Sequence, residues 1–96
     1  MEILDLEQQY KELELEVKMR DFRNSKLPLF YAKFKDSDVV DGNVIRGVYG
    51  NGNTIDEAIQ DYCKEISGRV LVINRYSDNP KTFFIPKVKH TKLFGK

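Results

Sequence analysis

Hydrophobic and polar positions alternate with two different periods near the start of the chain. Over residues 3–17 apolar side chains recur every three or four positions, whereas residues 12–20 alternate strictly between apolar and charged side chains. The first period is typical of a helix and the second of a half-buried strand. Because the two patterns overlap, we predict a short helix over residues 3–9, followed by a strand over about residues 12–22.

Two further strand patterns follow, joined by a polar turn. Residues 29–35 come after Pro28, which has no amide hydrogen to donate and therefore suits the start of a strand. Residues 36–38 are open to two interpretations, a continuation of this strand or its end. The sequence Asp-Gly-Asn at 41–43 is typical of a hairpin turn, so residues 44–49 are predicted to form a third strand.

The clearest local signal is a helix that follows a predicted loop over residues 50–53. Thr54 and Glu57 have the spacing of a capping box, in which each side chain satisfies a free amide at the helix start. Gly68 is placed to end this helix in a left-handed conformation. Between them runs one apolar stripe, made of Ile55, Ala58, Ile59, Tyr62, Cys63 and Ile66.

Two short apolar runs follow the helix. Residues 70–73 are typical of a well-covered strand, and residues 81–85 predict a last strand that Pro86 stops. Residues 87–96 are predicted to be a basic, solvated tail. The expected fold class is therefore α+β, with the order β-β-β-α-β-β and one amphipathic helix on one face of an antiparallel sheet.

Length and composition narrow the class of protein. The chain of 96 residues, 41% hydrophobic and 32% charged, suits a single domain over residues 1–96, with its core in about residues 12–86. The net charge is only +1, although the first residues are acidic and the last are basic. One cysteine precludes an internal disulfide, and no apolar run approaches the roughly 20 residues that span a bilayer. Since no signal-peptide pattern is present, we expect a cytoplasmic protein with no membrane contact.

No motif of catalysis or ligand binding has its required spacing. The glycine-rich loop has Ile55 where a dinucleotide-binding fingerprint needs its third glycine. The aspartates of residues 36–41 suggest a calcium loop, but the twelfth position counted from Asp36 is Gly47, where an EF-hand needs glutamate. Cys63 lies on the apolar stripe, and the only histidine, His90, falls in the predicted tail. We therefore expect no enzyme activity, catalytic residue, cofactor or metal site.

Aromatic side chains beside lysines offer a binding alternative. The chain has six Phe and five Tyr, and Tyr31 is followed by lysines at alternate positions of a predicted strand. Such a strand can stack bases on an open sheet face, although aromatic residues also pack within cores. If the chain binds nucleic acid, the predicted contacts are Lys33, Lys35, Lys87, Lys89 and Lys92.

The residues at the helix start resemble a known family. Residues 49–59 read Tyr-Gly-Asn-Gly-Asn-Thr-Ile-Asp-Glu-Ala-Ile, and the Gly-x-Thr-x-x-Glu-Ala portion resembles the HicB antitoxin domain. Over about residues 12–86 the chain is also similar to small phage or prophage proteins related to that fold. The resemblance implies a β-β-β-α-β domain that binds and blocks a small ribonuclease toxin and that oligomerises.

The chain also departs from that family. Few residues follow residue 86, where many members carry a DNA-binding segment, and residues 46–49 replace a Pro-Asp-x-x-Gly-type approach to the helix. The matched positions are structural, so no functional residue carries over. The resemblance implies a non-enzymatic protein-binding module, phage-encoded and thus in the host cytoplasm, which modulates an unidentified partner protein and forms a homo-oligomer. The alternative is a nucleic-acid-binding module that uses the basic tail and the sheet lysines.

Overall fold

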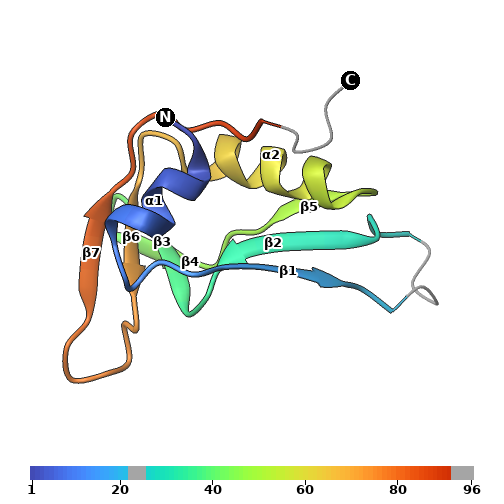
Figure 1. Ribbon diagram of the computed structural model, residues 1–96. Coiled ribbons are helices and arrows are strands. Elements are labelled where there is room, and N and C mark those ends of the chain that lie inside the picture. The colour runs from blue at the N-terminus through green and yellow to red at the C-terminus, as the bar shows by residue number, and fades with distance from the viewer. Residues whose placement is uncertain (22–25, 92–96) are drawn as a thin grey trace.

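The computed structural model describes residues 1–21 and 26–91, and it confirms the α+β class. Its strands form two antiparallel sheets, with the orders β1-β2-β5 and β4-β3-β6-β7 (Figure 1). The helix predicted over residues 3–9 is confirmed. In chain order the elements are α1 (Ile3–Gln9), β1 (Leu15–Met19), β2 (Phe30–Phe34), β3 (Ser37–Asp41), β4 (Val44–Arg46), β5 (Gly50–Gly52), α2 (Ile55–Ile66), β6 (Val70–Ile73) and β7 (Lys81–Phe84).

The prediction of a single sheet is wrong, because the chain bends sharply at Asp36. This residue has a φ of 57°, in the left-handed region that aspartate tolerates better than most residues. Its carbonyl accepts a hydrogen bond of 3.0 Å from the amide of Asn74, which fixes the bend. After the bend β3 pairs with β6 instead of extending β2, so the second sheet lies at one end of the first (Figure 1).

The predicted loop over residues 50–53 is largely a strand, and the predicted strand over residues 44–49 is split. Only Val44–Arg46 pairs with β3, across a hairpin turn in which Gly42 has a φ of 63°, as predicted. Gly50–Gly52 forms β5 and pairs with β2. A side chain at Gly50 would overlap the backbone of α2. Glycine is therefore required here because the strand and the helix approach so closely.

Helix α2 forms as predicted and covers one face of the first sheet (Figure 1). The Thr54 hydroxyl accepts a hydrogen bond of 3.1 Å from the Glu57 amide, while the Glu57 carboxylate accepts one of 2.9 Å from the Asn53 amide. Gly68 follows the helix with a φ of 73°. Of the predicted stripe, Ile55 alone is exposed, and the other five side chains are buried.

Both ends of the described chain pack into the core. The predicted core, about residues 12–86, does not include them. Ile3 and Leu6 of α1 and Val88 near the C-terminus are all buried with the α2 stripe. The Ile3 amide donates to the Lys89 carbonyl and the Lys89 amide to the Met1 carbonyl, at 2.8 and 3.0 Å. The predicted solvated tail is therefore wrong for residues 87–91, because alternate side chains of this segment pack inward.

His90 is the residue for which the prediction of a solvated tail fails most clearly. The sequence places it in a solvated tail, but its side chain is only 2% exposed and its Nε2 lies 2.7 Å from Asp56 Oδ1 on α2. Its carbonyl accepts a further hydrogen bond of 2.8 Å from the Gln60 side chain. Residues 87–91 are thus fastened to the helix, on the side of the first sheet that α2 covers.

Candidate functional site

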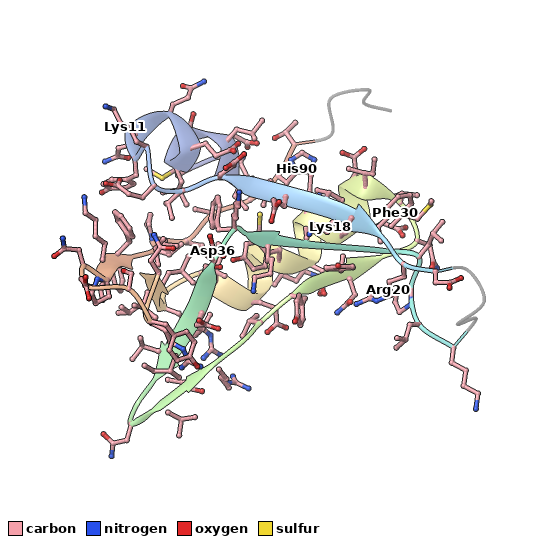
Figure 2. The ribbon with its side chains drawn as sticks, turned by 90° about the horizontal axis from the view of Figure 1, so that it is seen from below. Lys11, Lys18, Arg20, Phe30, Asp36 and His90 are labelled. Atoms are coloured by element: carbon pink, nitrogen blue, oxygen red, sulfur yellow. The ribbon has the colours of Figure 1, made fainter. Side chains whose placement is uncertain are left out.

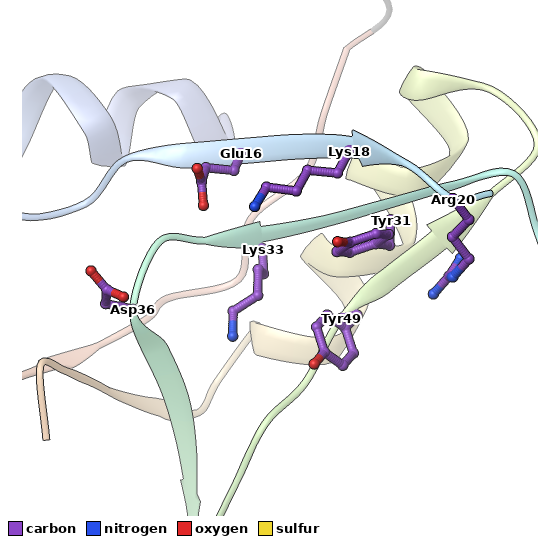
Figure 3. Close-up of a pocket in the computed structure, with 7 residues that line it drawn as sticks. All are labelled: Glu16, Lys18, Arg20, Tyr31, Lys33, Asp36 and Tyr49. Atoms are coloured by element: carbon purple, nitrogen blue, oxygen red, sulfur yellow. The ribbon is translucent and has the colours of Figure 1, made fainter. Parts of the chain in front are cut away.

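A hollow of about 570 Å³ lies on the other face of the β1-β2-β5 sheet, which α2 leaves uncovered. Figure 2 looks toward this face from below, with Lys18 and Arg20 projecting from β1 and its end. Figure 3 shows the side chains that line the hollow. They are Glu16, Lys18, Arg20, Tyr31, Lys33, Asp36 and Tyr49.

Strand register explains why these side chains meet. Within β2, Ala32 and Phe34 point into the core and are fully buried, so Tyr31 and Lys33 project from the opposite face. The antiparallel pairing sets Lys18 beside Tyr31, and Glu16 beside Lys33. Alternation along two adjacent strands therefore brings together four of the seven lining side chains.

The two tyrosines are held in place by cations and by each other. Their ring centres lie 5.6 Å apart in an edge-to-face arrangement. The Arg20 guanidinium lies 4.8 Å from the centre of the Tyr31 ring, and Lys33 Nζ lies 5.2 Å from that of Tyr49. Such contacts are attractive because the ring face is electron-rich.

Arg20 is itself anchored by the backbone. Its guanidinium donates to the carbonyls of Pro28 and Phe30, at 2.8 and 3.2 Å, and to the side-chain oxygen of Asn51 on β5. These bonds tie the three strands together at one end of the hollow. The aromatic part of the hollow is therefore organised before any ligand arrives.

The charges in the hollow are mixed and incompletely paired. Three cations face two carboxylates, yet in residues 1–21 and 26–91 no ion pair is formed by Lys18, Lys33, Glu16 or Asp36. Within these described ranges neither Lys18 nor Lys33 is tied to a carboxylate, and the contact of Lys33 with the Tyr49 ring leaves its ammonium group able to turn toward an anion. The hollow therefore offers two aromatic rings, two available ammonium groups and two available carboxylates.

The structure separates the lysines that the sequence groups together. Lys33 lines the hollow, whereas Lys35 lies just beyond the end of β2 and outside the lining. Lys87 and Lys89 are exposed on the segment that packs against α2, across the sheet from the hollow (Figure 1). Lys92 lies outside the described residues.

Sequence reasoning missed Lys18, Arg20 and Tyr49 as members of the site. The strict alternation over residues 12–20 does identify Lys18 and Arg20 as solvent-facing positions. Only the register shows that they face Tyr31, and Tyr49 precedes β5 outside any regular pattern. The sequence pattern therefore shows that these side chains are exposed, but not that they lie close to Tyr31.

The other nucleophile and ligand candidates are structural. Burial raises the pKa of the Cys63 thiol to about 11, so the thiol stays neutral and unreactive near neutral pH. Across the part of the chain that the structure describes, no three His, Cys, Asp or Glu side chains gather as a metal site would require. Neither described helix is long and apolar enough to cross a membrane.

Comparison with known proteins adds no identification. No protein-family model matches the chain, and neither a curated protein nor a solved structure matches it. The resemblance to the HicB antitoxin domain therefore stays a prediction from the sequence.

Proposed function

We propose that this chain is a binding module that holds single-stranded nucleic acid on the open face of the β1-β2-β5 sheet. The observation that carries the proposal is the pair Tyr31 and Tyr49, set among Arg20, Lys18 and Lys33 in one hollow. Aromatic side chains on a sheet stack bases, and neighbouring cations contact the phosphates that connect them. Both kinds of group are needed for such binding, and both line this one hollow.

A single strand suits this surface better than a duplex. Bases in a duplex are stacked on one another, so their faces are hidden from tyrosine rings, whereas an unpaired base exposes both faces. Tyr49 is 47% exposed and presents its ring to solvent. The volume of the hollow also lies within the roughly 300–1,000 Å³ typical of sites for small organic ligands, and so has room for a nucleotide.

The test is a fluorescence-anisotropy titration of the full chain with labelled 12-nucleotide RNA and DNA, single-stranded and duplex, at 50 and 200 mM salt. The double variant Lys18→Ala/Lys33→Ala removes two charges from the hollow. Its matched control, Lys87→Ala/Lys89→Ala, removes two charges from the far side of the sheet. We expect the first variant to lower the salt slope by about 1.4, since each phosphate contact on a single strand contributes about 0.7. The control is expected to leave the slope unchanged.

Stacking is tested separately with Tyr49→Leu, which removes the aromatic face but retains an apolar side chain. Loss of one base–aromatic stack costs about 1–3 kcal/mol, which corresponds to a roughly 5- to 150-fold weaker affinity. Circular dichroism melting controls for folding. The absence of binding by any single strand at 50 mM salt refutes the proposal, as does equal weakening by the two double variants.

A second candidate function, the binding of a protein partner, is favoured by the second sheet. Strand register aligns one apolar row across its four strands, through Ile45, Val40, Val70 and Phe84. Phe84 is 66% exposed and Ile45 is 41% exposed, and β4 is an edge strand. Exposed apolar rows and open edges recruit other chains, as the predicted modulator of a partner protein requires.

This second function predicts a protein that co-purifies in fixed stoichiometry with the tagged chain from its native host. Phe84→Asp is expected to abolish that co-purification, because a charge cannot be buried in an apolar contact without cost. Met19→Asp, which alters an equally exposed apolar side chain on the first sheet, is the matched control. Retention of the partner by Phe84→Asp would exclude this surface.

A further inference from the structure

The fold closes one edge of the first sheet and leaves the other open. At the β5 edge, the amides of Asn51 and Asn53 donate to the carboxylates of Asp61 and Glu57 on α2, at 2.8 and 2.9 Å. Side chains of the helix therefore cover this edge. The opposite edge is β1, beyond which the described chain places no further strand (Figure 1). An edge strand that is left open is a template for pairing with another chain.

The open backbone groups of β1 belong to its odd-numbered residues. The Glu14 carbonyl and the Arg20 amide bond to residues that flank β2, at 2.8 and 2.7 Å, so the even-numbered residues turn their backbone groups toward β2. In an antiparallel ladder the backbone groups of the intervening residues point the other way. Within the described part of the chain, the amides of Val17 and Met19 have no hydrogen-bond partner. They are therefore available to a further strand.

The charges along β1 have the order that suits pairing with a second copy of the same strand. On the open face of the sheet the acid Glu16 precedes the base Lys18, and Val17 lies between them in the sequence. If two copies of β1 run antiparallel with Val17 opposite Val17, Glu16 of each copy lies opposite Lys18 of the other. Neither side chain forms an ion pair within the described residues. Opposite charges in directly opposed positions stabilise a sheet.

The neighbouring antiparallel registers oppose like charges. Moving the centre from Val17 by one residue sets Glu16 opposite Glu16, or Lys18 opposite Lys18. Moving it by two residues sets Glu14 opposite Glu16, or Lys18 opposite Arg20. Like charges directly opposite each other are destabilising. The sequence of the strand therefore favours the register centred on Val17, and it favours a second copy of this chain over an unrelated strand.

We propose that the chain forms a homodimer in which β1 pairs antiparallel with β1 of a second copy, centred on Val17. The two copies of Val17 exchange a reciprocal pair of hydrogen bonds, and each Glu16 faces Lys18 of the other copy. The two three-stranded sheets then form one continuous sheet. Because the two-fold axis is perpendicular to this sheet, both hollows lie on the same face, with the two β2 strands about 14 Å apart, or three strand spacings.

The experiment is sedimentation velocity of the full chain over a range of concentrations at 50 mM salt, without nucleic acid. Glu16→Lys and Lys18→Glu each oppose like charges at both symmetric positions of the pairing. The double variant Glu16→Lys/Lys18→Glu restores opposite charges within one kind of chain. An equal mixture of the two single variants restores them only between unlike chains. The matched controls Glu65→Lys and Lys87→Glu make the same changes of net charge outside β1. Thermal melting of each variant verifies the fold.

We expect the wild-type chain and both controls to reach twice the 11.2 kDa mass of one chain as concentration rises. Each single variant is expected to dimerise roughly 4- to 900-fold more weakly, because two cross-strand pairs change from attraction to repulsion. The double variant and the equal mixture are expected to recover the dimer.

A wild-type chain that stays monomeric overturns the proposal. So do single variants that dimerise as tightly as wild type, which would place the contact on another surface, and a mixture of single variants that stays monomeric. Since the assay contains no nucleic acid, none of these outcomes bears on the proposed function.

Discussion

Replacement of Gly50 by alanine tests the contact that places β5 beneath α2. The added Cβ would lie closer than 3.0 Å to the Ala58 carbonyl and to the Tyr62 amide, both of which are backbone groups of the helix. These groups cannot rotate away as a side chain would. To restore ordinary contacts of about 3.5 Å, the helix must move from the sheet by roughly 1 Å.

This displacement disturbs the whole buried stripe of α2. Overpacking usually costs about 1–3 kcal/mol, and we expect the upper end because backbone atoms must yield. A loss of about 3 kcal/mol corresponds to a fall in Tm of roughly 12–24 °C for a domain of this size. Binding of nucleic acid is expected to weaken as well, since Tyr49, which directly precedes β5, lines the hollow.

The assay is thermal melting followed by circular dichroism, combined with a urea titration. Gly47→Ala is the control, because a Cβ there meets only the Asp38 side chain at 3.7 Å, an ordinary contact. We expect that control to change stability by less than about 0.5 kcal/mol. A Gly50→Ala variant that melts within a few degrees of wild type would refute the close packing of β5 and α2.

Three further predictions concern the helix cap, the thiol and the C-terminal segment. Thr54→Ala is expected to cost about 1 kcal/mol in urea denaturation, since one amide of α2 loses its acceptor; an unchanged midpoint would contradict the cap. Cys63 is expected to react with iodoacetamide at pH 8 only as fast as the chain opens, and rapid stoichiometric labelling would contradict its burial. His90→Ala is expected to cost about 1–3 kcal/mol and to speed hydrogen exchange of the Ile3 and Lys89 amides. Unaltered exchange at those amides would show that His90 does not fasten the segment.

Local patterns in the sequence predicted most of the individual elements. The cap at Thr54 and the apolar stripe identified α2 because both signals act within a few residues. The division into two sheets was missed, since it depends on the bend at Asp36, and the local sequence there has no glycine to mark a left-handed residue. The strand at Gly50 was predicted as a loop for a related reason. Its glycines are required by the close approach of α2, which is distant in the sequence, and not by a local turn.

The candidate site was predictable only in part. Tyr31 and Lys33 were singled out by alternation within one strand, which is a local signal. Their meeting with Lys18 depends on the register of β1 against β2, and a single strand does not specify its own register. For His90, the alternation of Val88 and His90 with exposed lysines was a usable signal that an assumption of a solvated tail obscured.

The most direct test of the central claim is a map of amide chemical shifts in the ¹⁵N-labelled chain during titration with a single-stranded 12-mer. If the open face of the first sheet is the binding surface, the largest shifts occur at Lys18, Tyr31, Lys33 and Asn51. These shifts grow as oligomer is added and then reach a plateau. The exposed lysines on the α2 side of the sheet, Lys87 and Lys89, then stay near their free positions. Shifts confined to residues 87–91, or no shifts at 50 mM salt, would contradict the account.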